Sequence, residues 1–544
     1  MAVALFLRRE YIVALMRALE KRLLRGASLS LSDASSIEIL KRALNSPHPG
    51  EVLYSLNMLE EMEHESLGEL LIGLINHPAA AIRKDVLTRI ARLRVMSALD
   101  SLTKRVEEEE EAEVKGAALK TLCELGETEV FDFVYPYLND DDWAIRKGAM
   151  VGLLRSGGIE GVLAAGESLM ALVQSRDSHE RRCAAEVFGD MEIRHFYRPL
   201  VQLLNDSHHG VKRAALAAAG DLGNPRLWPL VIEHLGMPEV SETAFSALVK
   251  GGESVVGDLE RHFLRKDQDS RARMRVVKIA GRIRGGICVE FLLKHIGHPD
   301  AKVRHQILLS LSACSFRADE VQKRLIRKQI FNDIGGAAWS IGALVDIGEE
   351  EKFAMLSRAL LYDIDRSIDR MLLLLSFVYP SEAILGARTN LTHASVAKRA
   401  YAMETLDNLL SQELKDAFLP LIDDIKPDQK LKRLEHVCPQ EHAGAIQRLS
   451  EIIERPLHAS SAWSKACSLY ILGQMMEGKY TDAVAGALAS SSETVRETAL
   501  WALWQIKPDD LQEHIGGLVH DSSTRVARMA RYIMSSESVV RPAT

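Results

Sequence analysis

The chain has 544 residues, of which 47% are hydrophobic and 26% charged, and this composition excludes a wholly disordered protein. Its formal net charge of −7 counts against a general nucleic-acid binder, which neutralises phosphates with Lys and Arg. The 16 prolines and 6% aromatic residues favour helix over strand. The six cysteines lie far apart without a CxxC pair, which predicts reduced thiols and neither a disulfide framework nor a zinc site.

Residues 1–30 are predicted to form a basic amphipathic helix. Its apolar residues recur at helical spacing, and the opening apolar run Ala2–Leu7 is too short to span a membrane. The helix carries six cations that would face a membrane surface: Arg8, Arg9, Arg17, Lys21, Arg22 and Arg25. Such a helix fits an anionic membrane surface or a partner protein. The alternative is a structural helix that covers the exposed end of the fold.

The rest of the chain repeats one phrase: a polar turn, a Val, a basic residue, an Ala and then Leu-Gly. The clearest copy runs from Asn205 to Gly223. Similar copies are centred on Ile82, Val114, Ile145, Val303 and Val495. Weaker copies are centred on Val52, Glu180, Val240, Ala272, Ile334, Ile368, Val396, Ala462 and Val526. The steps average about 31 residues, which predicts about sixteen repeats.

Each repeat carries the signals of two helices. Carboxylates that can cap a helix start precede the Val position by five residues, at Asp140, Asp206, Asp267 and Asp521. Glycines that can end a helix in the left-handed conformation follow it by twelve residues, at Gly126, Gly157 and Gly223. A two-helix unit cannot bury its apolar faces alone, so we expect an all-α protein, a right-handed α-solenoid whose repeats stack into a superhelix.

The repeated phrase resembles HEAT repeats, particularly the short bacterial type also found in phycobilin lyases. The resemblance covers nearly the whole chain and is specific for a fold rather than for a function. With it we divide the chain into regular repeats at 31–310, divergent repeats at 311–480 and C-terminal repeats at 481–536. Residues 537–544 are predicted to be a disordered tail.

A narrower resemblance concerns the second half of the chain. The segments Arg370–Pro380, Ala402–Leu410, Leu419–Asp424 and Val495–Leu503 are similar to the HEAT-repeat section of bacterial fusion proteins. In those proteins a membrane domain similar to nucleotide (ATP/ADP) carriers precedes the repeats. The resemblance implies a cytoplasmic regulatory module near the membrane. It transfers no transport or nucleotide-binding residue, because the segments that hold those residues are missing here.

Signals for enzyme chemistry are mostly negative. The phosphate-loop, dinucleotide-binding, HExxH and GxSxG patterns are missing. Deoxyhypusine hydroxylase is a HEAT-like protein that binds two irons through repeated His-Glu pairs, but His64-Glu65 and His179-Glu180 fall at different repeat phases. We therefore predict no metal and no cofactor. His208-His209 is predicted to lie at the surface or cap a helix, and Trp501 and Trp504 are predicted to pack in the core.

A basic residue follows the Val position in many repeats and defines a basic column. Its members are Arg83, Lys115, Arg146, Arg181, Lys212, Arg273, Arg304 and Arg496. Stacked repeats would align them along the second helices, where they could dock an acidic peptide, a phospholipid or nucleic acid. In the alternative, each cation pairs with an acidic residue of its own or the next repeat, such as Asp140, Asp206 or Asp267.

These observations favour a non-enzymatic scaffold for protein–protein interaction. We expect a cytoplasmic protein of bacterial character that binds a protein partner on the concave face formed by the second helices. It would be peripheral at the inner face of the membrane if the N-terminal helix binds there. One alternative is the regulatory module of a nucleotide-carrier-like transporter. The other is a HEAT-like enzyme, either a chromophore lyase or a DNA glycosylase, and the net charge counts against the glycosylase.

Overall fold

A computed structural model of the chain describes residues 34–540 apart from 194, 267, 458, 509 and 510. The predicted N-terminal helix and its cations lie outside the described residues. The chain divides into two compact units between Gly251 and Gly252, and each unit is described by itself. Helices make up the regular structure, and no strand occurs among the described residues, which confirms the predicted all-α class.

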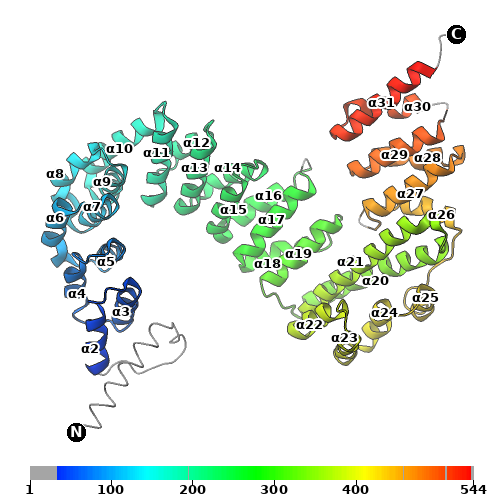
Figure 1. Cartoon of the computed structure of the whole chain (residues 1–544), viewed down its shortest axis with the longest axis horizontal. Coiled ribbons are helices and arrows are strands. Elements are labelled where there is room, and N and C mark those ends of the chain that lie inside the picture. The colour runs from blue at the N-terminus through cyan, green and yellow to red at the C-terminus, as the bar shows by residue number, and fades with distance from the viewer. Residues whose placement is uncertain (1–33, 194, 267, 458, 509–510, 541–544) are drawn as a thin grey trace, which may run out of the picture. The chain divides into compact units, whose positions relative to one another are not determined.

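The first unit is a row of helix pairs (Figure 1). The second helix of each pair packs on the second helix of the next pair, so that α3, α5, α7, α9, α11, α13 and α15 form one continuous layer. The helices of this unit are α2 (Ala34–Ala43), α3 (Pro49–Glu61), α4 (Leu67–Leu74), α5 (Ala80–Arg92), α6 (Leu99–Glu108), α7 (Ala112–Gly126), α8 (Phe131–Val134), α9 (Trp143–Ser156), α10 (Gly158–Gln174), α11 (Ser178–Asp190), α12 (Arg198–Leu204), α13 (His209–Leu222), α14 (Trp228–Glu233) and α15 (Ser241–Lys250).

The ends of these helices lie close to the predicted positions. Asp140 Oδ1 accepts a hydrogen bond from the backbone N–H of Asp142, and Asp142 caps α9 through the N–H of Ala144. The N-cap of α9 is therefore Asp142, two residues after the predicted Asp140. The carboxylate of Asp140 instead accepts a hydrogen bond within the turn that precedes the helix. Gly223 ends α13 at φ +60°, as predicted. After α7 the residue with positive φ is Glu127, one position later than predicted, and its ψ of −123° lies outside the left-handed helical region.

A column of glycines, which the repeated phrase did not predict, lets the second helices approach closely. A Cβ on Gly220 of α13 would lie 2.8 Å from the Cα of Ala247 in α15. A Cβ on Gly473 would lie 2.8 Å from the Cα of Ala502 in the neighbouring helix of the second unit. Gly220 stands eight residues after Lys212 of its own helix, and Gly473 stands eight residues after Lys465 of its own helix. Close backbone contact thus recurs at one register of the array.

The second unit begins and ends with similar pairs. The second helices α17 and α19 pack together, as do α27, α29 and α31. Its helices are α16 (Val256–Phe263), α17 (Ser270–Ile283), α18 (Gly286–Lys294), α19 (Ala301–Ala313), α20 (Glu320–Ile347), α21 (Ala354–Val378), α22 (Ser381–Leu391), α23 (Val396–Leu409), α24 (Gln412–Ile422), α25 (Pro427–Leu434), α26 (Ala445–Glu454), α27 (Ala462–Met475), α28 (Thr481–Gly486), α29 (Glu493–Ile506), α30 (Leu511–Ile515) and α31 (Thr524–Val540). Helix α31 extends four residues past the predicted end of the repeats at 536.

Two long helices interrupt the repeat in the middle of this unit. Helix α20 has 28 residues and α21 has 25, and they pack along each other (Figure 1). The copies expected at Ile334 and Ile368 lie inside these helices, so neither begins a second helix. The buried pair of Arg370 and Asp333, at 2.8 Å, crosses between the two helices at this level. The count of about sixteen repeats stays a prediction.

The C-terminal repeats share a core with the long helices. Leu356 and Leu360 of α21 belong to the same buried cluster as Leu472 of α27 and Leu500 of α29. Trp501 and Trp504 pack against this cluster and are partly buried, which agrees with the predicted core packing. The burial of these side chains holds α27, α29 and α31 in one stack.

Candidate interaction surfaces

Three members of the basic column, Arg83, Arg181 and Arg496, are held inside the array. The Nη1 atom of Arg181 donates to the carbonyl of Ser175, in the turn before its own helix, at 2.9 Å. Its Nε and Nη2 atoms donate to the two carboxylate oxygens of Asp206 at 2.6 and 3.1 Å. Asp206 lies in the turn that precedes α13, so this arginine ties one repeat to the next.

The same bridge recurs at both ends of the chain. Arg83 donates to Glu109 at 2.8 and 2.9 Å, and Arg496 donates to Asp521 at 2.8 and 2.7 Å. The hydrogen bond from Arg496 holds the pKa of Asp521 below its ordinary value. These side chains make the internal pairs that the sequence analysis gave as the alternative, and their donors are already engaged.

Arg273 and Arg304 also donate to main-chain carbonyls near the start of their own helices. Nε of Arg273 lies 3.2 Å from the carbonyl oxygen of Phe263, and Nη1 of Arg304 lies 3.0 Å from that of His298. Burial lowers the pKa of Arg304. The predicted acidic partner Asp267 lies outside the described residues.

The remaining members of the column are held differently. Lys115 lies over the ring of Tyr137 at 5.5 Å, and Arg146 lies over the ring of Trp143 at 5.6 Å. Lys212 forms no ion pair with any residue that the structure describes. The column is therefore not a uniform row of available cations, and a docking role for it stays a prediction.

The bridge geometry also corrects the register of two divergent repeats. Val396 is 70% exposed, and Arg399 makes the bond to the carbonyl of His393 that marks the basic-column position. In the repeat placed on Ala462, that position belongs to the buried Lys465, whose Nζ donates to two main-chain carbonyls at the end of α26 and just after it. Burial lowers the pKa of Lys465 to about 8. Both copies were predicted two residues too early, because the residue before the basic-column position is Lys398 in the first repeat and Ser464 in the second, and neither is Val.

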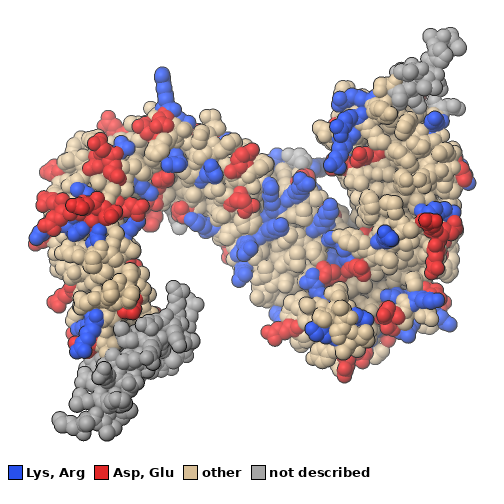
Figure 2. All heavy atoms as spheres, viewed as in Figure 1, with Lys and Arg blue, Asp and Glu red and all other residues tan. Residues whose placement is uncertain are grey.

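A different set of cations lies along one face of α17. Arg271, Arg275, Lys278 and Arg282 recur at spacings of four, three and four residues and therefore share one face of the helix. Arg271, Lys278 and Arg282 are exposed and form no ion pair with the described part of the chain. The opposite face, with Val276 and Val277, is fully buried. Figure 2 shows Lys and Arg gathered over α16–α19. We call these four residues the α17 stripe.

The α17 stripe differs from the basic column, which has one basic residue per repeat, because all four of its cations lie within a single repeat. A helical spacing of cations within a single repeat was the signal that could have found it. Arg273, the column member on α17, lies between two stripe residues but turns to main-chain carbonyls.

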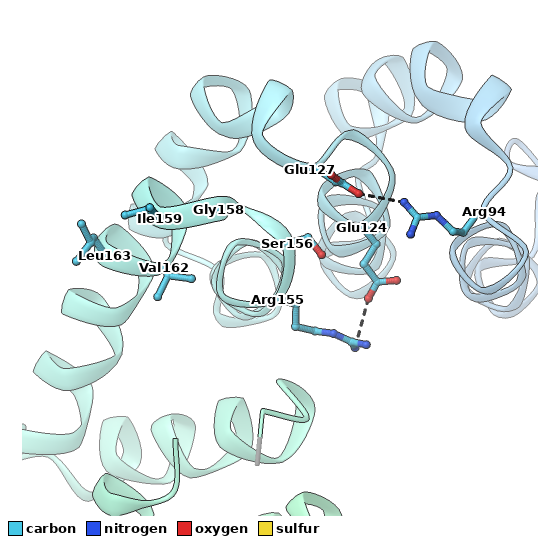
Figure 3. Close-up of a pocket in the computed structure, with 9 residues that line it drawn as sticks. All are labelled: Arg94, Glu124, Glu127, Arg155, Ser156, Gly158, Ile159, Val162 and Leu163. Carbon is cyan, nitrogen blue, oxygen red and sulfur yellow. Dashed lines mark hydrogen bonds and ion pairs between the residues drawn. The ribbon is translucent and has the colours of Figure 1, made fainter. Parts of the chain in front are cut away.

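The first unit contains an open depression of about 620 Å³ where α7, α9 and α10 meet. Figure 3 shows two ion pairs at one side of it, Arg94 with Glu127 and Arg155 with Glu124, at 3.0 and 3.3 Å. The other side is apolar and exposed, formed by Ile159, Val162 and Leu163 of α10. Both carboxylates that line it are engaged by arginines, so the depression presents no free general base beside Ser156.

Histidines that the sequence singled out serve local structure. His208 Nδ1 accepts the backbone N–H of Gly210 at 3.2 Å and caps α13, as predicted. His64 Nδ1 accepts the N–H of Ser66 at 3.1 Å in the turn before α4. No group of three or more His, Cys, Asp or Glu side chains that could hold a metal occurs among the described residues. Within that same part of the chain, every helix is too short or too polar to cross a membrane.

Comparisons with known proteins give one family match. Residues 99–189 match the family model of HEAT repeats. This segment covers α6 to α11 and includes three members of the basic column. No curated protein matches the sequence.

Solved structures give distant likenesses. Yeast importin-beta (Kap95p) is 12% identical, with 88% of this chain and 74% of that chain covered and a TM-score of 0.32. Human deoxyhypusine hydroxylase is 14% identical over 52% of this chain and 96% of its own, at a TM-score of 0.25. The complex of CpcE and CpcF of phycocyanin lyase from Nostoc sp. is 16% identical, with 45% of this chain and 94% of that chain covered and a TM-score of 0.26. Likenesses at this level carry no functional inference.

Proposed function

We propose that the chain, of which residues 99–189 match the family model of HEAT repeats, is a HEAT-repeat protein and a non-enzymatic scaffold for protein–protein interaction. The binding surface is the exposed side of the second helices, which forms the concave face in arrays of this kind. The partner at this surface is an acidic segment of another protein. The observation that carries the proposal is the α17 stripe, a row of four cations on a second helix of which Arg271, Lys278 and Arg282 are exposed.

The stripe matches a short protein segment in length and charge. Arg282 lies eleven positions after Arg271, and at a rise of 1.5 Å per residue the cations extend over about 16 Å of helix. A segment with several carboxylates can meet them at once, and each contact is a charge-assisted hydrogen bond. Nucleic acid is the weaker candidate, because its binders make about six to ten phosphate contacts and this chain carries a net charge of −7.

Charge reversal of the stripe tests the proposal. The probe is a labelled peptide of alternating Glu and Ser, measured by fluorescence polarisation at low and physiological salt. The variant R271E/K278E/R282E should bind it at least about tenfold more weakly than the natural chain, because complementary charges become repulsive. The matched control K426E/K432E/K507E changes three exposed cations of the same unit and should bind as the natural chain does.

Two further probes decide between partner classes. A single-stranded oligonucleotide of equal charge and vesicles with phosphatidylserine are tested against the same proteins. Tighter, stripe-dependent binding of either one would replace the protein partner with that class. Equal loss of peptide binding in the control variant, or no binding by the natural chain, would overturn the proposal.

A further inference from the structure

Aromatic side chains occupy one register of the last three second helices. Tyr470 of α27, Trp501 of α29 and Tyr532 of α31 are each 31 residues apart, and Trp504 follows one turn after Trp501. Tyr470 is 39% exposed and Tyr532 is 61% exposed. We call these four residues the aromatic ladder. Large exposed apolar groups that align across several elements mark interaction surfaces.

The ladder consists of two ring pairs, one for each junction between neighbouring helices. Tyr470 and Trp501 stack at 4.7 Å between ring centroids, with an angle of 19° between ring planes. Trp504 and Tyr532 meet edge to face at 6.2 Å. The first pair therefore lies between α27 and α29, and the second lies between α29 and α31.

The surrounding residues fix the rings in place. A Cβ on Gly473 would lie 2.8 Å from the Trp501 ring, so glycine provides the space in which that ring lies. The Nε2 atom of Gln474 donates to the hydroxyl of Tyr470 at 2.9 Å. Both tryptophans also pack against the buried core of the unit. The exposed ring faces are thus ordered before any partner arrives, which lowers the entropic cost of binding.

The spacing of the ring pairs suits one peptide conformation. Packed helices lie about 8–10 Å apart, so successive ring pairs repeat at about that distance across the stack. A polyproline II segment has three residues per turn and a rise of 3.1 Å, which gives a repeat of about 9 Å. A segment that crosses the helices can therefore place one proline on each ring pair. Proline-rich segments bind aromatic surfaces in this extended form.

Charge on α31 adds a second requirement for the partner. Arg525 and Arg528 precede Tyr532 by seven and four residues, so they share its helix face. Both are exposed, and neither forms an ion pair with a described residue. A segment that carries carboxylates where it crosses α31 would complement them. A cationic segment would meet repulsion there.

We propose that the aromatic ladder binds an extended proline-rich segment of a protein partner that ends in acidic residues over α31. The ladder is a second site, separate in residues from the α17 stripe. Single-stranded nucleic acid fits less well, because Tyr470 and Trp501 already stack on each other and leave no gap for a base between them.

Peptide binding tests this inference in the full chain. The probe is a labelled peptide of Pro-Pro-Ala repeats that ends in two glutamates, measured by fluorescence polarisation. The variant Y470S/Y532S should bind it at least about tenfold more weakly, because the exposed ring faces are lost. The control Y362S/Y401S removes two tyrosines of the same unit that are 54% and 65% exposed and should leave binding unchanged. Far-ultraviolet circular dichroism checks that both variants fold.

Changes in the peptide test the conformation and the charge separately. Glycine in place of proline, or lysine in place of the terminal glutamates, should each weaken binding about tenfold or more. The inference would be overturned if the glycine peptide bound equally well, if Y470S/Y532S bound as the natural chain does, or if the natural chain did not bind. Tighter, ladder-dependent binding of oligothymidine would also overturn it. The variant R271E/K278E/R282E should bind the proline-rich peptide as tightly as the natural chain does. A wrong proposal for the aromatic ladder can therefore be distinguished from a wrong proposal for the α17 stripe.

Discussion

At the scale of single residues, three members of the basic column, Arg83, Arg181 and Arg496, join consecutive repeats through ion pairs. The carboxylate of Asp521 connects α29 to the start of α31. It accepts hydrogen bonds from Arg496 of α29 and from the backbone N–H of Ser523, just before α31, each at 2.7 Å. Both side chains of the ion pair are close to fully buried. Removal of the negative charge leaves a buried guanidinium without its ion-pair partner, which is costly in a region of low dielectric constant.

We therefore expect the substitution Asp521→Asn to lower the free energy of unfolding at pH 7 by about 1–3 kcal/mol. The folded chain lowers the pKa of this carboxyl below its ordinary value of 3.8. Its contribution is therefore present above pH 3.8 and is lost as the pH falls through the lower folded value. Urea unfolding at several pH values should show this acid-dependent loss in the natural chain and less of it in the variant. The control Asp482→Asn, at an exposed carboxylate without an ion pair among the described residues, should change neither value.

At the scale of helices, the sequence predicted the two-helix unit, its period and its all-α class, because turn signals and apolar spacing act locally. It did not predict that α20 and α21 are continuous. Gly335 and Gly336 lie inside α20, which packs along α21 and is joined to it by the pair of Asp333 and Arg370. The internal pairing of the column depends on carboxylates about 25 residues away that only the stacking brings near. The 31-residue spacing of the aromatic ladder was visible in the sequence, but its exposure was not.

Close packing of the second helices predicts opposite effects for two glycine-to-alanine changes. In an exposed helix interior this change stabilises by about 0.5–1 kcal/mol. Gly166 of α10 has no neighbouring atom within 4 Å of the added Cβ, so Gly166→Ala should show that gain. Gly220→Ala places a Cβ 2.8 Å from the backbone of α15 and should instead destabilise by about 1–3 kcal/mol. Urea unfolding of both variants measures the two changes in the free energy of unfolding. Changes of the same sign would mean that α13 and α15 can separate freely.

At the scale of the whole molecule, the chain divides into two units that each contain their own buried residues. Arrays of repeats obtain their stability from contacts between neighbours, so cooperativity reaches only as far as strong contacts continue. We expect equilibrium unfolding in urea to show two transitions, one for each unit. Leu216 of α13 and Leu500 of α29 are both fully buried and report on the two units separately.

The substitutions Leu216→Ala and Leu500→Ala should each lower the free energy of unfolding of their own unit by about 2–5 kcal/mol, because each leaves a cavity in a packed core. Each should shift one transition and leave the other in place. Tryptophan fluorescence can assign them, since Trp143 and Trp228 belong to the first unit and the other four tryptophans belong to the second. A single transition that both variants shift equally would mean that the two units unfold as one. Two independent transitions would allow a partner bound at α17 or at the aromatic ladder to stabilise the second unit alone, by an amount set by its concentration and affinity.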